Sequence, residues 1–169
     1  MSNKALLIVD VQIRLFESKK PVYNSKTLLD NINILEKKSQ DKNSTVVYIQ
    51  HENLTTFKYG NPDWHLHPSL APRENDLFIR KKECNSFFET PLNQILKARE
   101  IDSVIVCGLL SNRCVMQTCL GAIYYNYNKF LVSDAHSNTS IKPEDTIKKT
   151  NNKLIKSGVN LVATKDVKF

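Results

Sequence analysis

Three side chains whose types suit hydrolysis follow short apolar runs at widely separated points of the chain. Asp10 ends the run ALLIVD, Lys81 follows DLFIR, and Cys114 comes shortly after SVIVCG. A cysteine attacks a carbonyl group as the thiolate, which a nearby cation and a helix amino terminus favour. An aspartate within reach can take the thiol proton and later give it to a leaving amine. Together these residue types suggest a cysteine nucleophile, with Lys81 holding the carboxylate and favouring the thiolate, but the combination is not specific to catalysis.

The elements that must position these residues are indicated by short apolar runs that alternate with longer amphipathic segments. Brief runs of aliphatic and β-branched residues are typical of strands buried on both faces of a parallel sheet. We expect strands over Ala5–Val9, Val46–Ile49, Leu77–Ile79, Val104–Cys107, Phe130–Val132 and Asn160–Ala163. Apolar spacing and end signals predict helices over Thr27–Lys38, Thr90–Arg99, Cys114–Tyr125 and Lys142–Lys156.

This alternation predicts an α/β fold, a three-layer α/β/α sandwich with a mostly parallel, Rossmann-like six-stranded sheet, in one domain over residues 1–169. In open sheets of this kind, ligands bind beyond the carboxyl ends of the strands. Asp10, Lys81 and the turn before Cys114 all follow strands, so we expect them to meet at one edge. The long irregular stretch His51–Asp76 is expected to be functional. Strand-end acids and lysines and buried helix cysteines also occur in many α/β domains without catalysis, which is the structural alternative.

The composition favours a soluble protein with a solvated basic surface. The chain has 24 basic and 17 acidic residues, a net charge of +7, and its lysine pairs are scattered without arginine–aromatic interleaving. This pattern argues against a nucleic-acid-binding module, which is kept as a third hypothesis. No apolar run approaches the roughly 20 residues that span a bilayer, and the apolar start is too short for a secretory signal. We therefore expect a cytoplasmic protein without a membrane or nucleic-acid partner.

The cysteine pattern favours free thiols. Cys84, Cys107, Cys114 and Cys119 include no Cys-x-x-Cys pair, and a chain of this length without an export signal is expected to lack structural disulfides. Cys107 lies in an expected strand and Cys119 in an expected helix. We therefore interpret both as small buried hydrophobic residues.

Four segments in order resemble signatures of the isochorismatase-like cysteine hydrolases. They are ALLIVDVQ, KKECNSFFETPL, VCGLLSNRCV and LVSDAHS, and the resemblance runs from Lys4 to Ser137. The resemblance implies that Asp10, Lys81 and Cys114 form a catalytic triad, with Lys82 as the nearest competitor for the lysine role. Four ordered motifs are more specific than any single one.

The same resemblance implies further features of the turn before Cys114. A cis peptide bond is expected between Leu109 and Leu110, and the N–H groups of Leu110 and Cys114 are expected to form an oxyanion hole. His136, in the DAHS segment, is expected to orient a loop through hydrogen bonds.

Members of this family differ in substrate. By resemblance, nicotinamidases and the ureidoacrylate and carbamoylsarcosine amidohydrolases form an acyl-enzyme on the cysteine, whereas isochorismatases proper cleave a vinyl ether without it. Cys114 therefore favours hydrolysis of an amide or other C–N bond in a small-molecule substrate, with no cofactor. The alternatives are vinyl ether hydrolysis and a catalytically degenerate binding or scaffold protein. The family further implies a homodimer or homotetramer.

Four residues are candidates for the substrate pocket. Phe57 and Trp64 are aromatic residues of the long loop, where they suit pocket walls or dimer contacts. Phe87 is expected near the ligand or, equally, in the core, and Gln12 either faces the site or caps the turn after the first strand.

No metal site is expected. His65 and His67 stand at alternate positions and could bind zinc. Nicotinamidases, however, carry an Asp-x-His pair directly after the second strand, where this chain has Gln50-His51-Glu52. The later Asp63-Trp64-His65 reads better as a feature of metal-free members.

Overall fold

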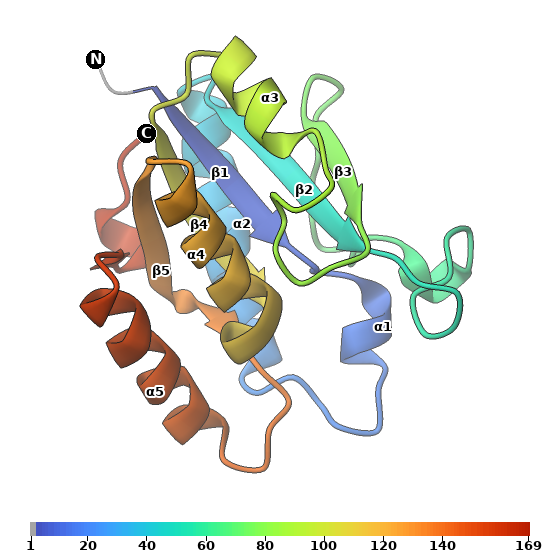
Figure 1. The fold of residues 1–169 in the computed structure, drawn as a ribbon. Helices are drawn as coiled ribbons and strands as arrows, with labels where there is room; N and C mark the ends of the chain where they lie inside the picture. The colour runs from blue at the N-terminus through green and yellow to red at the C-terminus, as the bar shows by residue number, and fades with distance from the viewer. Residues whose placement is uncertain (1–2) are drawn as a thin grey trace.

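Short aliphatic runs pair into one parallel sheet in the computed structural model, which describes residues 3–169 (Figure 1). The first two residues of the predicted domain lie outside the described part. In spatial order the strands are β3 (Leu77–Lys81), β2 (Thr45–His51), β1 (Lys4–Val9), β4 (Ser103–Leu109), β5 (Asn128–Ser137) and β6 (Asn160–Val162). Every neighbouring pair is parallel. The predicted fold class, with six strands, is confirmed.

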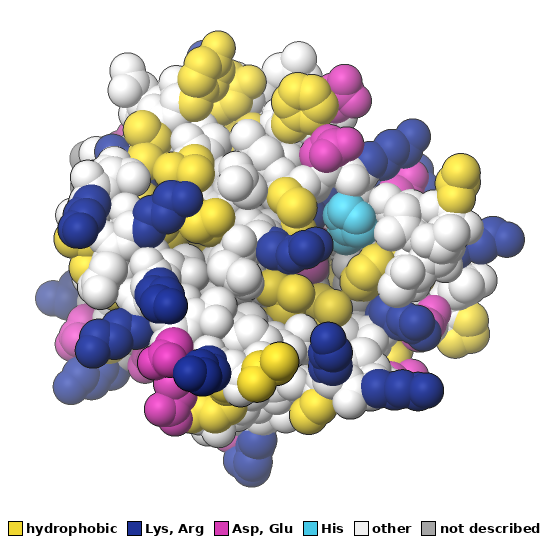
Figure 2. Space-filling model, turned by 60° about the horizontal axis from the view of Figure 1, so that its bottom comes forward, with side chains coloured by type: hydrophobic (Ala, Val, Ile, Leu, Met, Phe, Trp, Pro, Cys, Tyr) yellow, Lys and Arg dark blue, Asp and Glu magenta, His cyan; other side chains and the backbone are white. Residues whose placement is uncertain are grey.

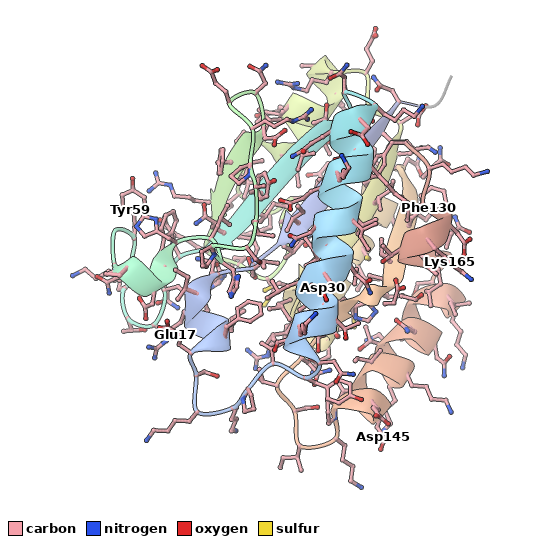
Figure 3. The ribbon with its side chains drawn as sticks, turned by 180° about the vertical axis from the view of Figure 1, so that it is seen from behind. Glu17, Asp30, Tyr59, Phe130, Asp145 and Lys165 are labelled. Carbon is pink, nitrogen blue, oxygen red and sulfur yellow. The ribbon has the colours of Figure 1, made fainter. Side chains whose placement is uncertain are left out.

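Helices cover both faces of the sheet. The helix α2 (Ser25–Asp41) lies on one face, where Figure 3 shows it crossing the back of the sheet with Asp30 on its outer side. The opposite face carries α3 (Leu92–Ala98), α4 (Met116–Tyr124) and α5 (Pro143–Lys156) (Figure 1). The sandwich therefore has three layers.

Alternation along β1 connects the two hydrophobic layers. Leu6 and Ile8 pack with the buried face of α2, whereas Leu7 and Val9 pack with the helices of the opposite face. Each fully buried aliphatic side chain contributes roughly 1.5–3 kcal/mol relative to an exposed one. A central strand buried on both faces fixes where its last residue, and therefore Asp10, must lie.

The strands and helices differ from the predicted ranges mainly at their ends. The strand expected over Phe130–Val132 continues to Ser137, because polar residues of the DAHS segment pair with β4 opposite Gly108 and Leu109. Three short elements were not predicted: α1 (Ile13–Phe16) and 3-10 turns over Pro62–Trp64 and Thr164–Asp166. The expected helix from Cys114 begins instead as a π-type turn over Ser111–Val115, with α4 following from Met116.

Gly108 allows β4 to approach β1 near the site. Its φ is +113°, and a Cβ atom placed there would lie 2.2 Å from the carbonyl oxygen of Val9. The β4–β5 register shifts between Val106 and Gly108 at this point. A residue without a side chain is therefore required where the chain turns toward Cys114.

The surface shows no concentration of basic side chains on the face in Figure 2, where Lys and Arg are spread out with acidic groups among them. All four cysteines are free, and Cys107 and Cys119 are fully buried as expected. Within residues 3–169, no helix combines the length and apolar character needed to cross a membrane.

Gly108→Ala is expected to destabilise the protein by roughly 3 kcal/mol or more, because it adds a steric clash to a left-handed backbone. Gly158→Ala is the matched control: its φ is +87°, but no heavy atom lies within 4 Å of the added Cβ. That variant should lose only about 1 kcal/mol. Urea unfolding of both variants measures the difference, and equal losses would contradict the steric explanation.

Candidate active site

Asp10 and Lys81 meet at the carboxyl edge of the sheet. Asp10 follows β1, and Lys81 is the last residue of β3, with β2 between the two strands. The Lys81 Nζ lies 2.9 Å from the Asp10 Oδ2, and the two residues are 2% and 3% exposed. Burial is the largest single influence and by itself would lower the pKa of Lys81, but the interactions with Asp10 and Cys114 together outweigh it and raise that pKa. The result is a charged ion pair shielded from water.

The competing lysine lies elsewhere. Adjacent residues at the end of a strand point to opposite sides. Lys82 is exposed and lines a separate cavity of about 520 Å³ with residues of the long loop, including Glu52 and Tyr59. Lys81 is therefore the lysine that contacts Asp10.

Asp10 reaches the site through a change of backbone direction. Its N–H still donates to the Ile49 carbonyl at 2.8 Å, so the β1–β2 ladder continues through this residue. Its φ is then +51°, a left-handed conformation that aspartate tolerates better than most residues. This turn directs the carboxylate toward Lys81 instead of along the strand.

The turn after β4 presents Cys114. The Leu109–Leu110 peptide is cis, as expected, and Arg113 has φ −127° and ψ −106° inside the π-type turn. The N–H groups of Arg113 and Val115 both donate to the Leu110 carbonyl, at 3.0 and 3.3 Å. The Cys114 Sγ lies within 4.8 Å of an Asp10 carboxylate oxygen. The three predicted residues are therefore brought together.

The protonation state of Cys114 differs from the sequence expectation. The residue is only 8% exposed, and burial raises the pKa of its thiol, with the negative charge of Asp10 adding to the effect and Lys81 opposing it. Burial therefore opposes the ionisation of the thiol that is expected from the sequence. That expectation counts the cation and the helix start but not desolvation, and α4 begins two residues later, at Met116.

His51 is a site residue that sequence reasoning missed. The ammonium of Lys81 has three protons and three acceptors: Asp10 Oδ2 at 2.9 Å, the Glu83 carbonyl at 3.2 Å and His51 Nδ1 at 3.4 Å. Since an ammonium only donates, Nδ1 must be the unprotonated ring nitrogen. Burial, followed by the charge of Lys81, lowers the pKa of His51. The sequence could have indicated this residue, because His51 ends β2, the strand that lies between those leading to Asp10 and Lys81.

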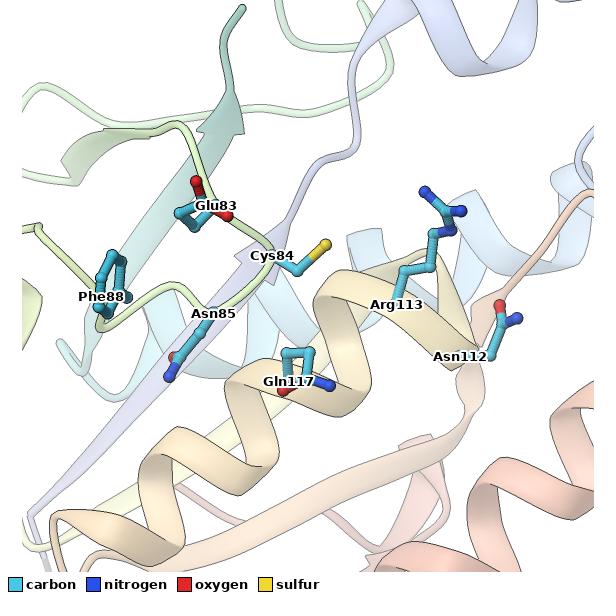
Figure 4. Close-up of a pocket in the computed structure, with 7 residues that line it drawn as sticks. All are labelled: Glu83, Cys84, Asn85, Phe88, Asn112, Arg113 and Gln117. Carbon is cyan, nitrogen blue, oxygen red and sulfur yellow. The ribbon is translucent and has the colours of Figure 1, made fainter.

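A cavity of about 600 Å³ lies between the loop after Lys81 and the turn before Cys114, lined by neighbours of these two residues in the chain (Figure 4). One wall is formed by the loop after Lys81 and the other by the segment on either side of Cys114. The lining residues are Glu83, Cys84, Asn85, Phe88, Asn112, Arg113 and Gln117. In Figure 4 the Cys84 sulfur points across the cavity toward the turn that carries Arg113. The cavity has the position and size of a small-molecule site.

The two walls are joined beneath the cavity. Ser86 and Thr118 share a buried hydroxyl–hydroxyl hydrogen bond of 2.6 Å, which connects the loop after β3 to α4. Gly121 lets these segments approach, because a Cβ there would lie 2.4 Å from the Asn85 Oδ1. The loop and the helix therefore hold a fixed spacing.

Two of the four pocket candidates support the loop instead of lining this cavity. The fully buried Gln12 donates to the carbonyl oxygens of His51 at 3.1 Å and Trp64 at 2.7 Å, and accepts the His51 N–H at 2.9 Å. The Trp64 indole donates to the same His51 carbonyl at 3.1 Å. Both side chains use their polar atoms on the backbone, so they fix the position of His51.

The two phenylalanines lie in different surroundings. Phe57 is half-buried, and its ring lies edge-on to His51 with centroids 5.4 Å apart. Phe87 is 3% exposed and stacks on Tyr127 within the core, which is the structural alternative left open for it. Its exposed neighbour Phe88 lines the cavity.

The structure offers metal ligands at a different place from the two histidines considered first. Within residues 3–169, the cluster of three His, Cys, Asp or Glu side chains with converging ligand atoms is Asp10, His51 and Cys114. His67 instead shares a 2.9 Å hydrogen bond with the Ser69 hydroxyl, and His65 is exposed.

His136 orients the turn that carries Cys114. Its Nδ1 lies 2.8 Å from the Ser111 Oγ, and its Nε2 lies 2.9 Å from the Asn151 Oδ1 on α5. Since the amide oxygen accepts, Nε2 carries the proton and Nδ1 accepts from Ser111. The expectation that His136 orients a loop is confirmed.

Comparisons with known proteins show which family the chain resembles. The model of the isochorismatase domain family matches residues 4–166. The chain is 29% identical over 149 residues to streptothricin hydrolase of Streptomyces noursei, covering 87% of this chain and 54% of that protein. It is 33% identical over 76 residues to ureidoacrylate amidohydrolase RutB of Klebsiella pneumoniae subsp. pneumoniae, covering 45% and 32%. The chain spans only part of each of these named proteins.

The fold is also similar to solved structures. A crystal structure of an isochorismatase from Pseudomonas putida KT2440 superposes with a TM-score of 0.87 at 23% identity, covering 96% of this chain and 89% of that one. At this identity the likeness shows the shared fold alone.

The buried His136 predicts a loss of stability in acid. Burial lowers its pKa to about 4 in the folded protein, whereas an unfolded histidine titrates near 6.5. Protonation therefore favours the unfolded chain, and the stability present above pH 6.5 falls as the pH drops toward 4. The loss at pH 5 should be about 2 kcal/mol at most. Urea unfolding at pH 7 and pH 5 measures it, and His136→Gln should show a smaller difference between the two; an unchanged difference would contradict this assignment.

Proposed function

Because this chain belongs to the isochorismatase family and is a hydrolase, we propose that it cleaves an amide or other C–N bond of a small molecule through an acyl-enzyme on Cys114. The amidohydrolase among its named relatives supports this bond type. A thiol beside a carboxylate supports a covalent mechanism over direct attack by water. No cofactor takes part in the proposed steps.

The proposal depends most on the unpaired oxygen of Asp10. Oδ2 accepts from Lys81, whereas Oδ1 is buried without a hydrogen-bond partner. A buried carboxylate oxygen without a partner is costly and is suited to accept a proton. With the Cys114 Sγ within 4.8 Å of a carboxylate oxygen, the thiol is the donor at hand.

In the first half of the reaction, the Cys114 sulfur attacks the carbonyl carbon while its proton passes to Asp10. The N–H groups of Leu110 and Cys114 stabilise the tetrahedral oxyanion. The C–N bond then breaks, and protonated Asp10 gives its proton to the leaving nitrogen. This leaves a thioester on Cys114 and a carboxylate at Asp10.

In the second half, Asp10 takes a proton from a water molecule that attacks the thioester carbon. The C–S bond breaks, the acid product leaves, and protonated Asp10 returns its proton to the sulfur. Lys81 remains charged throughout, so that it limits the cost of charge changes at Asp10 in a buried site. Lys81 acts here through electrostatics and does not accept a proton.

The cavity between the loop after Lys81 and the turn before Cys114 is the proposed substrate pocket. Phe57, whose ring lies against His51, stays a candidate for a further wall of this pocket. A homodimer or homotetramer and a cytoplasmic location stay predictions, which size-exclusion chromatography with light scattering and cell fractionation test.

Cys114→Ala should lower hydrolysis at least roughly 10³-fold, because the covalent route is lost. A panel of small amides, ureido acids and vinyl ethers, followed by ammonia and acid release, gives the substrate. Cys119→Ala is the control, since Cys119 is buried within α4 and has no place in the proposed pocket or chemistry. Mass spectrometry of the quenched reaction should find the acyl group on the Cys114 peptide. Unchanged turnover in folded Cys114→Ala would refute the nucleophile.

The same panel separates the two alternatives. Turnover confined to vinyl ethers and insensitive to Cys114→Ala would favour isochorismatase-type hydrolysis. Saturable ligand binding without turnover or an acyl adduct would favour a degenerate binding protein.

Lys81→Met and Lys82→Met form a matched pair that tests the ion pair. Removing Lys81 leaves the Asp10 carboxylate buried and unpaired, which should cost roughly 3–5 kcal/mol of stability and about 10²-fold in kcat. Removing the exposed Lys82 should change stability by less than about 0.5 kcal/mol. Thermal unfolding and steady-state kinetics at one pH measure both, and equal kinetic losses would contradict the role given to Lys81.

A further inference from the structure

Three chemically different ligand atoms converge at the carboxyl edge of the sheet. One carboxylate oxygen of Asp10, one ring nitrogen of His51 and the Cys114 sulfur all lie within 4.8 Å of one another. They come from the ends of β1 and β2 and from the turn after β4, so the central strands hold them in place. His51 belongs to none of the chemical steps proposed above.

We propose that Asp10, His51 and Cys114 bind a thiophilic divalent cation such as Zn²⁺, and that the bound ion blocks the nucleophile. Zinc is held by thiolate, imidazole and carboxylate ligands, and a site with three protein ligands leaves a fourth position for water. The ion replaces the proton on the sulfur. That the ion inhibits an activity rests on the proposed function, whereas its binding does not.

The separations suit such an ion after a small adjustment. Metal–ligand distances of about 2.0–2.3 Å place tetrahedral ligand atoms about 3.3–3.8 Å apart. Ligand atoms of Asp10, His51 and Cys114 that lie as far apart as 4.8 Å must therefore close by about 1–1.5 Å.

The unpaired oxygen of Asp10 points independently to a missing partner. Oδ1 is buried and accepts no hydrogen bond, while Oδ2 is used by Lys81. A cation at Oδ1 would satisfy this atom and leave the ion pair intact. Among the described residues, the only other buried side-chain oxygen or nitrogen without a hydrogen-bond partner is the Glu52 Oε2, which takes part in an ion pair with Arg80.

Lys81 opposes the ion. Its ammonium lies 3.4 Å from His51 Nδ1, the nitrogen that carries no proton and is therefore free to coordinate. An ion at this nitrogen must displace the lysine contact, and it meets the positive charge of Lys81 at short range. Lys81 should therefore weaken metal binding. Removing Lys81 should raise the affinity for the ion, whereas removing a ligand should lower it.

Cobalt titration of the purified full chain, in the absence of thiol reductants, tests the site without a substrate. Co²⁺ bound to a thiolate gives a sulfur-to-cobalt charge-transfer absorption in the near ultraviolet. We expect this band to saturate at one ion per chain, to disappear on addition of Zn²⁺, and to be absent in Cys114→Ser. His51→Asn should weaken binding at least tenfold, and His67→Asn should leave it unchanged.

Lys81→Met should bind Co²⁺ at least tenfold more tightly than the parent chain, with folding checked by circular dichroism. No thiolate band, a band retained in Cys114→Ser but lost in Cys84→Ser, or equal affinity in His51→Asn would each overturn the site. Weaker binding in folded Lys81→Met would overturn the competition with the lysine.

Once a substrate is known, Zn²⁺ should inhibit its turnover and a chelator should restore it. If the protein hydrolyses a substrate but shows no cobalt band, the metal site is refuted and the proposed function stands. If it shows the cobalt band but hydrolyses nothing, the proposed function is refuted and the metal site stands.

Discussion

The buried ion pair between Asp10 and Lys81 is the interaction on which the site depends. Two charges at 2.9 Å, both nearly inaccessible to water, are tolerated only because each compensates the other and hydrogen bonds satisfy the ammonium. The sheet makes this possible, since β2 separates the two strands and supplies His51 as the third acceptor. A carboxylate held in this way lies beside a thiol whose pKa is raised by burial.

The remaining architecture fixes the distance between that carboxylate and the sulfur. Gly108 brings β4 close to β1, and His136 holds Ser111 at the start of the turn that presents Cys114. Gln12 holds the backbone of His51 from the opposite side. None of these three residues takes part in the proposed reaction, yet Gly108 and His136 set the position of the turn that carries Cys114, and Gln12 sets the position of His51 beside Lys81.

Much of this arrangement could be predicted from the sequence. The end of an apolar run marks the end of a buried strand, and the carboxyl ends of parallel strands lie at one edge of the sheet. That rule found Asp10 and Lys81 and, with the motif order, Cys114. It missed His51, whose segment was compared only with a metal-binding pattern. The thiol's protonation state was beyond reach as well, because desolvation depends on how closely distant segments pack. For the same reason Phe87 could not be separated from Phe88 without coordinates.

The hydroxyl bond between Ser86 and Thr118 has a consequence for how related chains acquire new substrates. Because it ties the loop after β3 to α4, any change in the spacing of these two segments must break a buried hydrogen bond. Diversification would then proceed by exchanging the exposed side chains at the rim, among them Glu83, Phe88 and Arg113, while the backbone beneath stays unchanged. Selectivity would then lie in side chains that can be exchanged without altering the backbone beneath them.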